Sequence, residues 1–109
     1  MPNPRGAFRG LILFFLLFST QAQADLSADR QEKLEHLLLH DCGSCHGLTL
    51  KGGLGPPLTP GDLTEKPAEF LEEIIFHGMP DMAMPPWGEL LTREEIRWLV
   101  KRIKSGKTP

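Results

Sequence analysis

Three segments of the chain place apolar residues three and four positions apart, which is the spacing of one face of an α-helix. They span residues 27–41, 63–77 and 91–106. The apolar stripes are Leu34, Leu37, Leu38, Leu39 and Cys42; Phe70, Leu71, Ile74 and Ile75; and Ile96, Leu99, Val100 and Ile103. No segment alternates apolar and polar residues as a strand would. The sequence therefore predicts an all-α fold with three main helices.

The ends of these helices carry residues that favour helix starts and stops. Ser27 or Asp29 can cap the first helix, and Thr64 can cap the second, with Pro67 in the first turn, where its missing N–H costs nothing. Gly78 is the expected stop of the second helix. Thr92-Arg93-Glu94-Glu95 has the spacing of a capping box and predicts the start of the third.

Two segments between the helices cannot be regular structure. Residues 47–62 hold five glycines and three prolines, and residues 79–87 hold three prolines and three methionines. An ordinary mobile surface loop is one interpretation of residues 47–62. Long loops in a small domain are usually functional, however, so we expect a compact loop that shapes a site. In residues 79–87 the prolines should hold the backbone extended.

The first 24 residues have the pattern of a secretory signal peptide. Arg5 and Arg9 form a basic start, Leu11–Phe18 is an apolar run, and Ala22-Gln23-Ala24 is a small-residue cleavage site. A membrane anchor is the alternative, but the apolar run is far shorter than the roughly 20 residues that span a bilayer. Cleavage predicts an exported domain, residues 25–109, with no membrane segment of its own.

A domain of 85 residues has little core of its own, so a staple or a large prosthetic group is expected. It carries ten basic and fourteen acidic residues, a net charge of −4, which argues against nucleic acid as a partner. The charge is uneven: residues 25–92 sum to −8 and residues 93–109 to +4. The pattern predicts a basic C-terminal patch on an acidic body.

Cys42-Gly43-Ser44-Cys45-His46 is a C-x-x-C-H motif, the spacing of covalent haem attachment. Two thiols can add to the two vinyl groups of one haem, and the adjacent imidazole can then bind the iron. A disulfide, a thioredoxin-like redox pair and half of a zinc site are the alternatives. The chain has no second cysteine pair for zinc and no βαβ pattern for a redox fold, so haem attachment is favoured.

His36 and His40 lie four residues apart in the first helix, so they could hold a metal ion between them. No third ligand is near in sequence. The favoured interpretation at this point is a pair of solvated side chains.

The methionines of the proline-stiffened segment could be flexible filler of the core. In a chain that already supplies a histidine for haem, a methionine there is instead favoured as the sixth ligand of the iron. Met84 is favoured, because Pro85 restricts it to an extended backbone and Trp87 can pack beside the macrocycle and donate its indole N–H. Met79 directly follows the helix stop and should have less room to reach across, and Met82 is the other competitor.

Taken together, these pieces resemble the class I c-type cytochromes over the whole exported chain. The resemblance rests on Cys42-Gly43-Ser44-Cys45-His46-Gly47, the Gly55-Pro56 turn, Ile75-x-x-Gly78, Met84-Pro85-Pro86-Trp87 and the terminal amphipathic helix. It implies crossed first and last helices, long loops wrapped around one covalent haem c, His46 and Met84 as axial ligands, and a Pro56 carbonyl that accepts the His46 Nδ1 proton. One departure is Arg102 before Ile103, where such cytochromes often have an aromatic residue.

The narrower resemblance rests on the single short domain, the signal peptide and the G-M-P-D-M-A-M-P-P-W segment at residues 78–87. This combination looks most like the small monohaem cytochromes that accompany the haem-c/haem-d1 nitrite reductase of denitrifying bacteria. It implies a monomeric, periplasmic one-electron carrier that serves nitrite reductase and is assembled by the cytochrome c maturation machinery. Two filled axial positions leave no place for a substrate, so an enzyme is not expected. The alternatives are a maturation factor for the reductase or its haem d1 cofactor, and a haem that binds small ligands.

Overall fold

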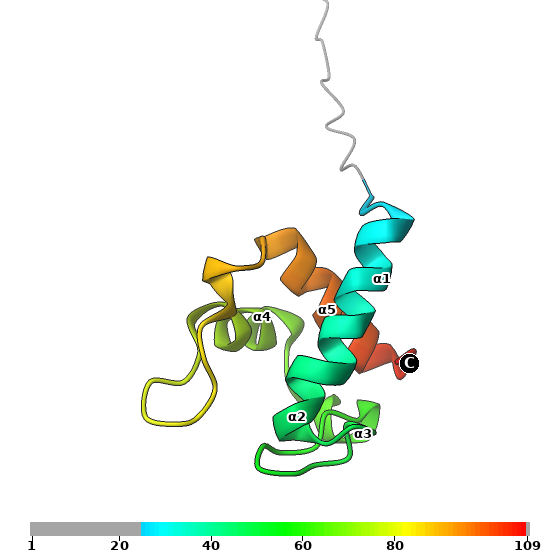
Figure 1. Cartoon of the computed structure of the whole chain (residues 1–109). Helices are drawn as coiled ribbons and strands as arrows, with labels where there is room; N and C mark the ends of the chain where they lie inside the picture. The colour runs from blue at the N-terminus through cyan, green and yellow to red at the C-terminus, as the bar shows by residue number, and fades with distance from the viewer. Residues whose placement is uncertain (1–24, 109) are drawn as a thin grey trace, which may run out of the picture.

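A computed structural model of the chain describes residues 25–108, and the predicted signal peptide lies outside them. The elements are α1 (Ala28–Leu37), the π-helical turn η1 (Leu38–Cys42), α2 (Gly43–His46), α3 (Pro60–Leu63), α4 (Ala68–His77), the 3₁₀ turn η2 (Trp87–Glu89) and α5 (Arg93–Ser105) (Figure 1). No strand occurs in this part of the chain, which confirms the all-α prediction. Of the helices in residues 25–108, none is long and apolar enough to cross a bilayer.

The first helix runs directly into the C-x-x-C-H motif. Ser27 caps α1, because its Oγ accepts a hydrogen bond from the Arg30 N–H at 3.2 Å. The backbone then passes through η1, where the Gly43 N–H bonds to the Leu38 carbonyl, and continues as α2. The predicted end near residue 41 was therefore too early. The π turn keeps the backbone hydrogen-bonded through the motif and extends the helix to His46.

The second helix begins later than predicted. Pro67 is the N-cap of α4 rather than a residue of its first turn, and Leu63 belongs to the separate short helix α3. The residue before a proline is disfavoured from helical geometry, so one helix cannot pass through position 66. Thr64 is not the cap: its Oγ1 donates to the Pro60 carbonyl at 2.8 Å. The glycine-rich segment accordingly ends at Thr59, which caps α3.

The third helix matches its prediction closely. The Thr92 N–H donates to Glu95 Oε2 at 2.9 Å, and the Glu95 N–H donates to Thr92 Oγ1 at 3.2 Å, so both halves of the capping box are present. Gly106 ends α5 in the left-handed conformation. Glu95 is buried and pairs with Arg30, which ties the start of α5 to α1.

The core forms where α1 crosses α5 and α4 packs along α5 (Figure 1). Leu34 and Leu38 of the first helix are buried against the predicted stripe of α5, which is Ile96, Leu99, Val100 and Ile103. Burying such side chains contributes about 1.5–3 kcal/mol each. The α4 stripe is different, because Phe70 stays half exposed and faces a cavity.

Three arginines of the predicted basic patch form ion pairs with carboxylates of neighbouring helices. Arg102 pairs with Glu35 of α1 and its guanidinium lies 5.2 Å from the centre of the Trp98 ring. The departure from the family pattern at Arg102 is thus accommodated by an ion pair across the α1–α5 crossing. Arg93 and Arg97 likewise pair with carboxylates of α4. The prediction of a separate basic patch is therefore only partly right.

Candidate functional site

The C-x-x-C-H motif presents its three reactive side chains on one side of a helix. Residues three and four apart share a helix face, so Cys42, Cys45 and His46 point the same way. All three line one large cavity, and both thiols are free. Ser44 lies on the opposite, exposed side, where its hydroxyl donates to the Asp41 carbonyl at 2.7 Å.

The environment of Cys42 argues against thiolate chemistry. Burial, with a smaller contribution from the charge of Asp41, raises the pKa of Cys42 to about 11. Redox-active cysteines of the thioredoxin type have a lowered pKa instead, so that the thiolate is available. Cys42 is therefore a protonated thiol at neutral pH, which disfavours the redox-pair interpretation.

His46 is held in a fixed orientation by the turn at Gly55 and Pro56. Its Nδ1 lies 2.7 Å from the Pro56 carbonyl oxygen, the contact that the family resemblance implies. A carbonyl can only accept, so Nδ1 carries a proton, and in the neutral imidazole the lone pair is on Nε2. A Cβ atom at Gly55 would lie 2.7 Å from His46 Nδ1, so only glycine allows this close approach. The turn fixes both the ring and its tautomer.

The glycine-rich loop is compact and returns to α2. The Gly52 N–H donates to the His46 carbonyl at 2.8 Å, and the Gly55 N–H donates to the Cys45 carbonyl at 2.8 Å. The last carbonyls of α2 are thereby satisfied by the loop instead of by water. This arrangement brings the Gly55-Pro56 turn against the imidazole and anchors the segment to α2.

The second loop, residues 78–86, is called the methionine loop here. Gly78 has a φ of +68°, and a Cβ atom on it would lie 2.7 Å from the Pro85 carbonyl carbon. The base of the loop is closed by the Met79 N–H, which donates to the Met84 carbonyl at 3.0 Å. A smaller cavity of about 300 Å³ lies along the loop. The two ends of the loop are thus held together, which fixes where its side chains project.

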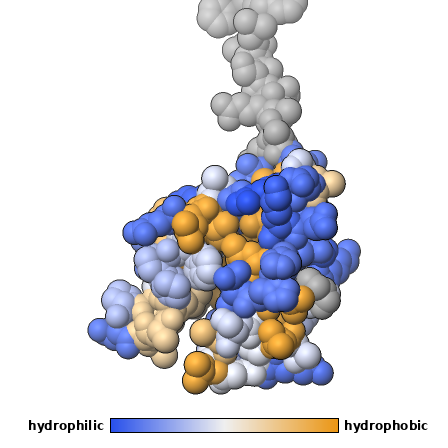
Figure 2. Space-filling view, viewed as in Figure 1, coloured by the Kyte–Doolittle hydropathy of each residue, from blue (hydrophilic) through white to orange (hydrophobic). Residues whose placement is uncertain are grey.

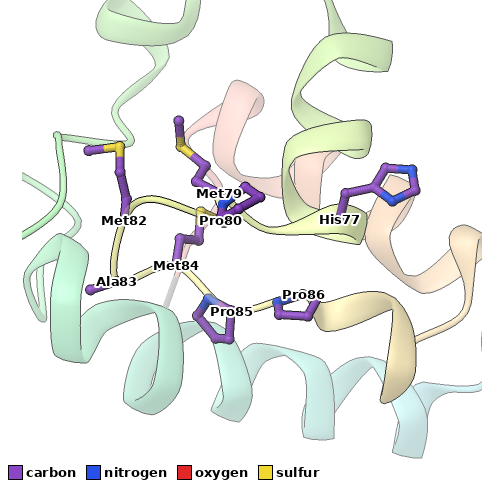
Figure 3. Close-up of a pocket in the computed structure, with 8 residues that line it drawn as sticks. All are labelled: His77, Met79, Pro80, Met82, Ala83, Met84, Pro85 and Pro86. Carbon is purple, nitrogen blue, oxygen red and sulfur yellow. The ribbon is translucent and has the colours of Figure 1, made fainter.

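All three methionines of this loop line the large cavity. Met84 is half-buried, whereas Met79 and Met82 are exposed. Figure 3 shows Met79 and Met82 projecting from the same side of the loop, with His77 of α4 turned away from it. Met79 thus lines the cavity as well, and the choice of Met84 over Met79 as iron ligand stays a prediction.

The large cavity has a volume of about 410 Å³. Its walls come from the first helix and its C-x-x-C-H motif, from both loops, and from α3, α4 and α5. Among the apolar wall residues that sequence reasoning did not assign to it are Leu54, Leu58, Phe70, Ile74 and Ile75. Trp87, which was expected there, also lines it. Figure 2 draws the molecule from the same side as Figure 1 and shows apolar residues in the middle of this face, between the hydrophilic surface of α1 and the methionine loop.

Leu54 and Phe70 are 91% and 52% exposed, although they are large apolar side chains. Exposed apolar residues that gather on one concave surface indicate a ligand site. A flat apolar macrocycle fits this cavity: its walls are largely apolar, two thiols lie three residues apart, and an imidazole with a fixed tautomer faces it. The residues present therefore fit a haem.

Comparisons with known proteins agree with this geometry. Residues 29–101 match the family described as "Cytochrome C oxidase, cbb3-type, subunit III". Cytochrome c55X of Stutzerimonas stutzeri is 50% identical over 92 residues, which cover 84% of this chain and 81% of that one. The solved structure of the c-type cytochrome NirC superposes with a TM-score of 0.75 at 52% identity, covering 77% of this chain and all of that one.

A more distant relative is a nitrite reductase of Stutzerimonas stutzeri. The match is 27% identical and covers 94% of this chain but only 20% of the reductase. The family match spans most of the described residues, and the cytochrome c55X match extends over most of both chains. The chain therefore belongs to this family of c-type cytochromes, whose cofactor is a covalently attached haem c.

Proposed function

We propose that the protein is a periplasmic one-electron carrier that donates electrons to a nitrite reductase. The observation that carries the proposal is the cavity, which brings together two thiols, an oriented imidazole and the thioethers of the methionine loop. The names of the relatives support the choice of partner: one is a nitrite reductase that contains a segment similar to this chain. The signal-peptide pattern of residues 1–24 supports the periplasm.

In this proposal, each site residue has a distinct role. Cys42 and Cys45 would hold the haem through thioether bonds, and His46 and Met84 would bind its iron. The Pro56 carbonyl orients the His46 ring and increases its basicity. Trp87 packs in the cavity wall beside the methionine loop.

When bound, the haem supplies an iron centre that can gain and lose one electron. Met84 tunes that centre, because a thioether ligand stabilises the reduced state and raises the potential. Phe70, Ile74 and Ile75 provide apolar wall that excludes water from the site. With His46 and Met84 both bound to the iron, the site would support electron transfer rather than substrate turnover.

The intact mass of the exported protein tests the attachment. We expect the mass of the chain from Asp25 to Pro109 plus one haem. A mass that is only two hydrogens below the bare chain would mean a disulfide and would contradict the proposal. The visible spectrum of the oxidised protein adds the test of ligation, because methionine ligation gives a thioether-to-iron charge-transfer band.

A maturation role is separated from the carrier role by isolating nitrite reductase from cells that lack this chain. A carrier leaves the reductase with its full cofactor content and slows only its supply of electrons. A maturation factor would leave a reductase that lacks its second haem. We expect the first result.

A further inference from the structure

Two histidines lie together on the outside of the first helix. His36 belongs to α1 and His40 to η1, and both side chains are exposed. Their ring centroids are 4.1 Å apart, and the ring planes are tilted by 40°. Neither residue is among those that line the large cavity. The pair is therefore separate from the haem site.

This arrangement is close to what a shared metal ion requires. With metal–nitrogen bonds of about 2.0–2.1 Å, two imidazoles in neighbouring positions on one ion have ring centroids about 4–5 Å apart. The rings of His36 and His40 already have nearly this spacing. Binding of a metal ion would then immobilise only the two imidazole rings, so its cost in conformational entropy is low.

The two imidazole ligands determine which metal ions the pair can bind tightly. Imidazole nitrogens favour borderline cations such as Cu²⁺, Ni²⁺ and Zn²⁺, and Cu²⁺ binds most tightly in that series. Residues 25–108 hold no cluster of three or more His, Cys, Asp or Glu side chains placed to share an ion, so the protein offers two ligands and water fills the other positions. Glu32 lies one turn before His36 on the same face and adds a negative charge nearby.

We propose that His36 and His40 form a surface site for one Cu²⁺ ion. The site uses one imidazole nitrogen from each residue and lies one turn before the C-x-x-C-H motif on the same continuous helix. It does not depend on the proposed electron partner, since it uses no residue of the haem site.

The oxidised holoprotein, titrated with a Cu²⁺ salt, tests the site by calorimetry and by electron paramagnetic resonance. We expect one Cu²⁺ per chain and hyperfine structure from two nitrogens. His36→Ala and His40→Ala should each weaken binding at least about tenfold, because loss of even an outer-sphere partner commonly weakens metal binding 10–100-fold. The matched control is His77→Ala, which removes another exposed helical histidine and should leave Cu²⁺ binding unchanged.

The proposal is overturned if no saturable binding occurs at one ion per chain. It is also overturned if the double variant His36→Ala/His40→Ala binds Cu²⁺ as tightly as the parent, because the ion would then be adventitious and located elsewhere. Both substitutions are on exposed helical positions where alanine favours the helix, so they should not impair folding. An unchanged haem spectrum in each variant checks this.

Discussion

Gly55 allows the His46 ring to lie against the loop backbone. In Gly55→Ala, the added Cβ would lie 2.7 Å from His46 Nδ1 and 2.8 Å from Cε1. The ring or the loop must shift, at a cost of about 1–3 kcal/mol, and the hydrogen bond to Pro56 should lengthen. A less basic imidazole stabilises the ferric iron less well, so the reduction potential should rise.

Voltammetry and thermal unfolding of the holoprotein measure both effects. Gly61→Ala is the matched control, because the nearest atom to its new Cβ would be Thr59 Oγ1 at 4.0 Å. Equal potentials in Gly55→Ala and the parent would show that the turn does not control the imidazole.

Met84 is the residue that the proposed ligation depends on most. Met84→Ala should abolish the thioether-to-iron charge-transfer band and lower the reduction potential. Met79→Ala and Met82→Ala should keep the band, although both side chains line the same cavity. Visible spectra of the three oxidised variants decide between them. Loss of the band in Met82→Ala alone would assign the ligand to Met82.

The sequence predicts site residues well where chemistry requires a fixed spacing, and less well where only shape is required. Cys42, Cys45 and His46 share a wall of the cavity because helix geometry places residues three and four apart together. Leu54 and Phe70 were not assigned to the cavity, since an apolar side chain in a loop or on a helix stripe looks the same whether it meets core or cofactor. Their exposure is the structural signal that reveals them.

At the scale of the helices, prediction succeeded where a local signal decides the boundary. The Thr92–Glu95 capping box and the Gly106 stop define α5 without help from tertiary structure. The π turn in residues 38–42 has no comparable signal, so the continuation of the first helix through the motif was missed. The late start of α4 could have been predicted, because Pro67 restricts the residue before it.

Glu95 links the capping box to the α1–α5 crossing. The ion pair with Arg30 and the hydrogen bonds from Thr92 lower the pKa of Glu95 below its ordinary value of 4.5, with Arg30 the larger cause. A lowered pKa in the folded state stabilises the fold above the unfolded-state pKa, and this stabilisation is lost as the pH falls through the folded value. Glu95→Gln should therefore be less stable than the parent at pH 7.

Denaturant unfolding at pH 7 and at a series of pH values below 4.5 measures the effect. The difference between Glu95→Gln and the parent should shrink steadily as the pH falls. Glu94→Gln, which changes the exposed neighbouring carboxylate, is the control and should show little difference at any pH. A difference for Glu95→Gln that is constant with pH would mean that the carboxylate charge is unimportant.

The whole molecule is organised around a cavity of about 410 Å³ with apolar walls. Without the haem, these walls face water, and the predicted exported domain, residues 25–109, has little other core to compensate. We expect the haem-free chain to be poorly folded, with reduced helix content and rapid proteolysis, and the holoprotein to unfold cooperatively. Circular dichroism and limited proteolysis of the two forms test this. A cooperative, protease-resistant haem-free form would contradict it.

Charge on the rim of the cavity should guide the partner. Asp41 and Asp81 are exposed on the first helix and the methionine loop, while α5 has much of its positive charge paired. A small, charge-steered encounter allows rapid binding and release and weakens as salt rises. Asp81→Lys should therefore change the association rate much more than the reduction potential.

The rate of electron transfer from the reduced protein to nitrite reductase, measured anaerobically by stopped flow at increasing ionic strength, tests the proposed function most directly. We expect fast, second-order reoxidation of the haem that slows as salt rises and is altered in Asp81→Lys. Absence of transfer on the timescale of reductase turnover would contradict the carrier role. Transfer that is fast but indifferent to both salt and Asp81→Lys would retain the carrier role and show that docking is apolar.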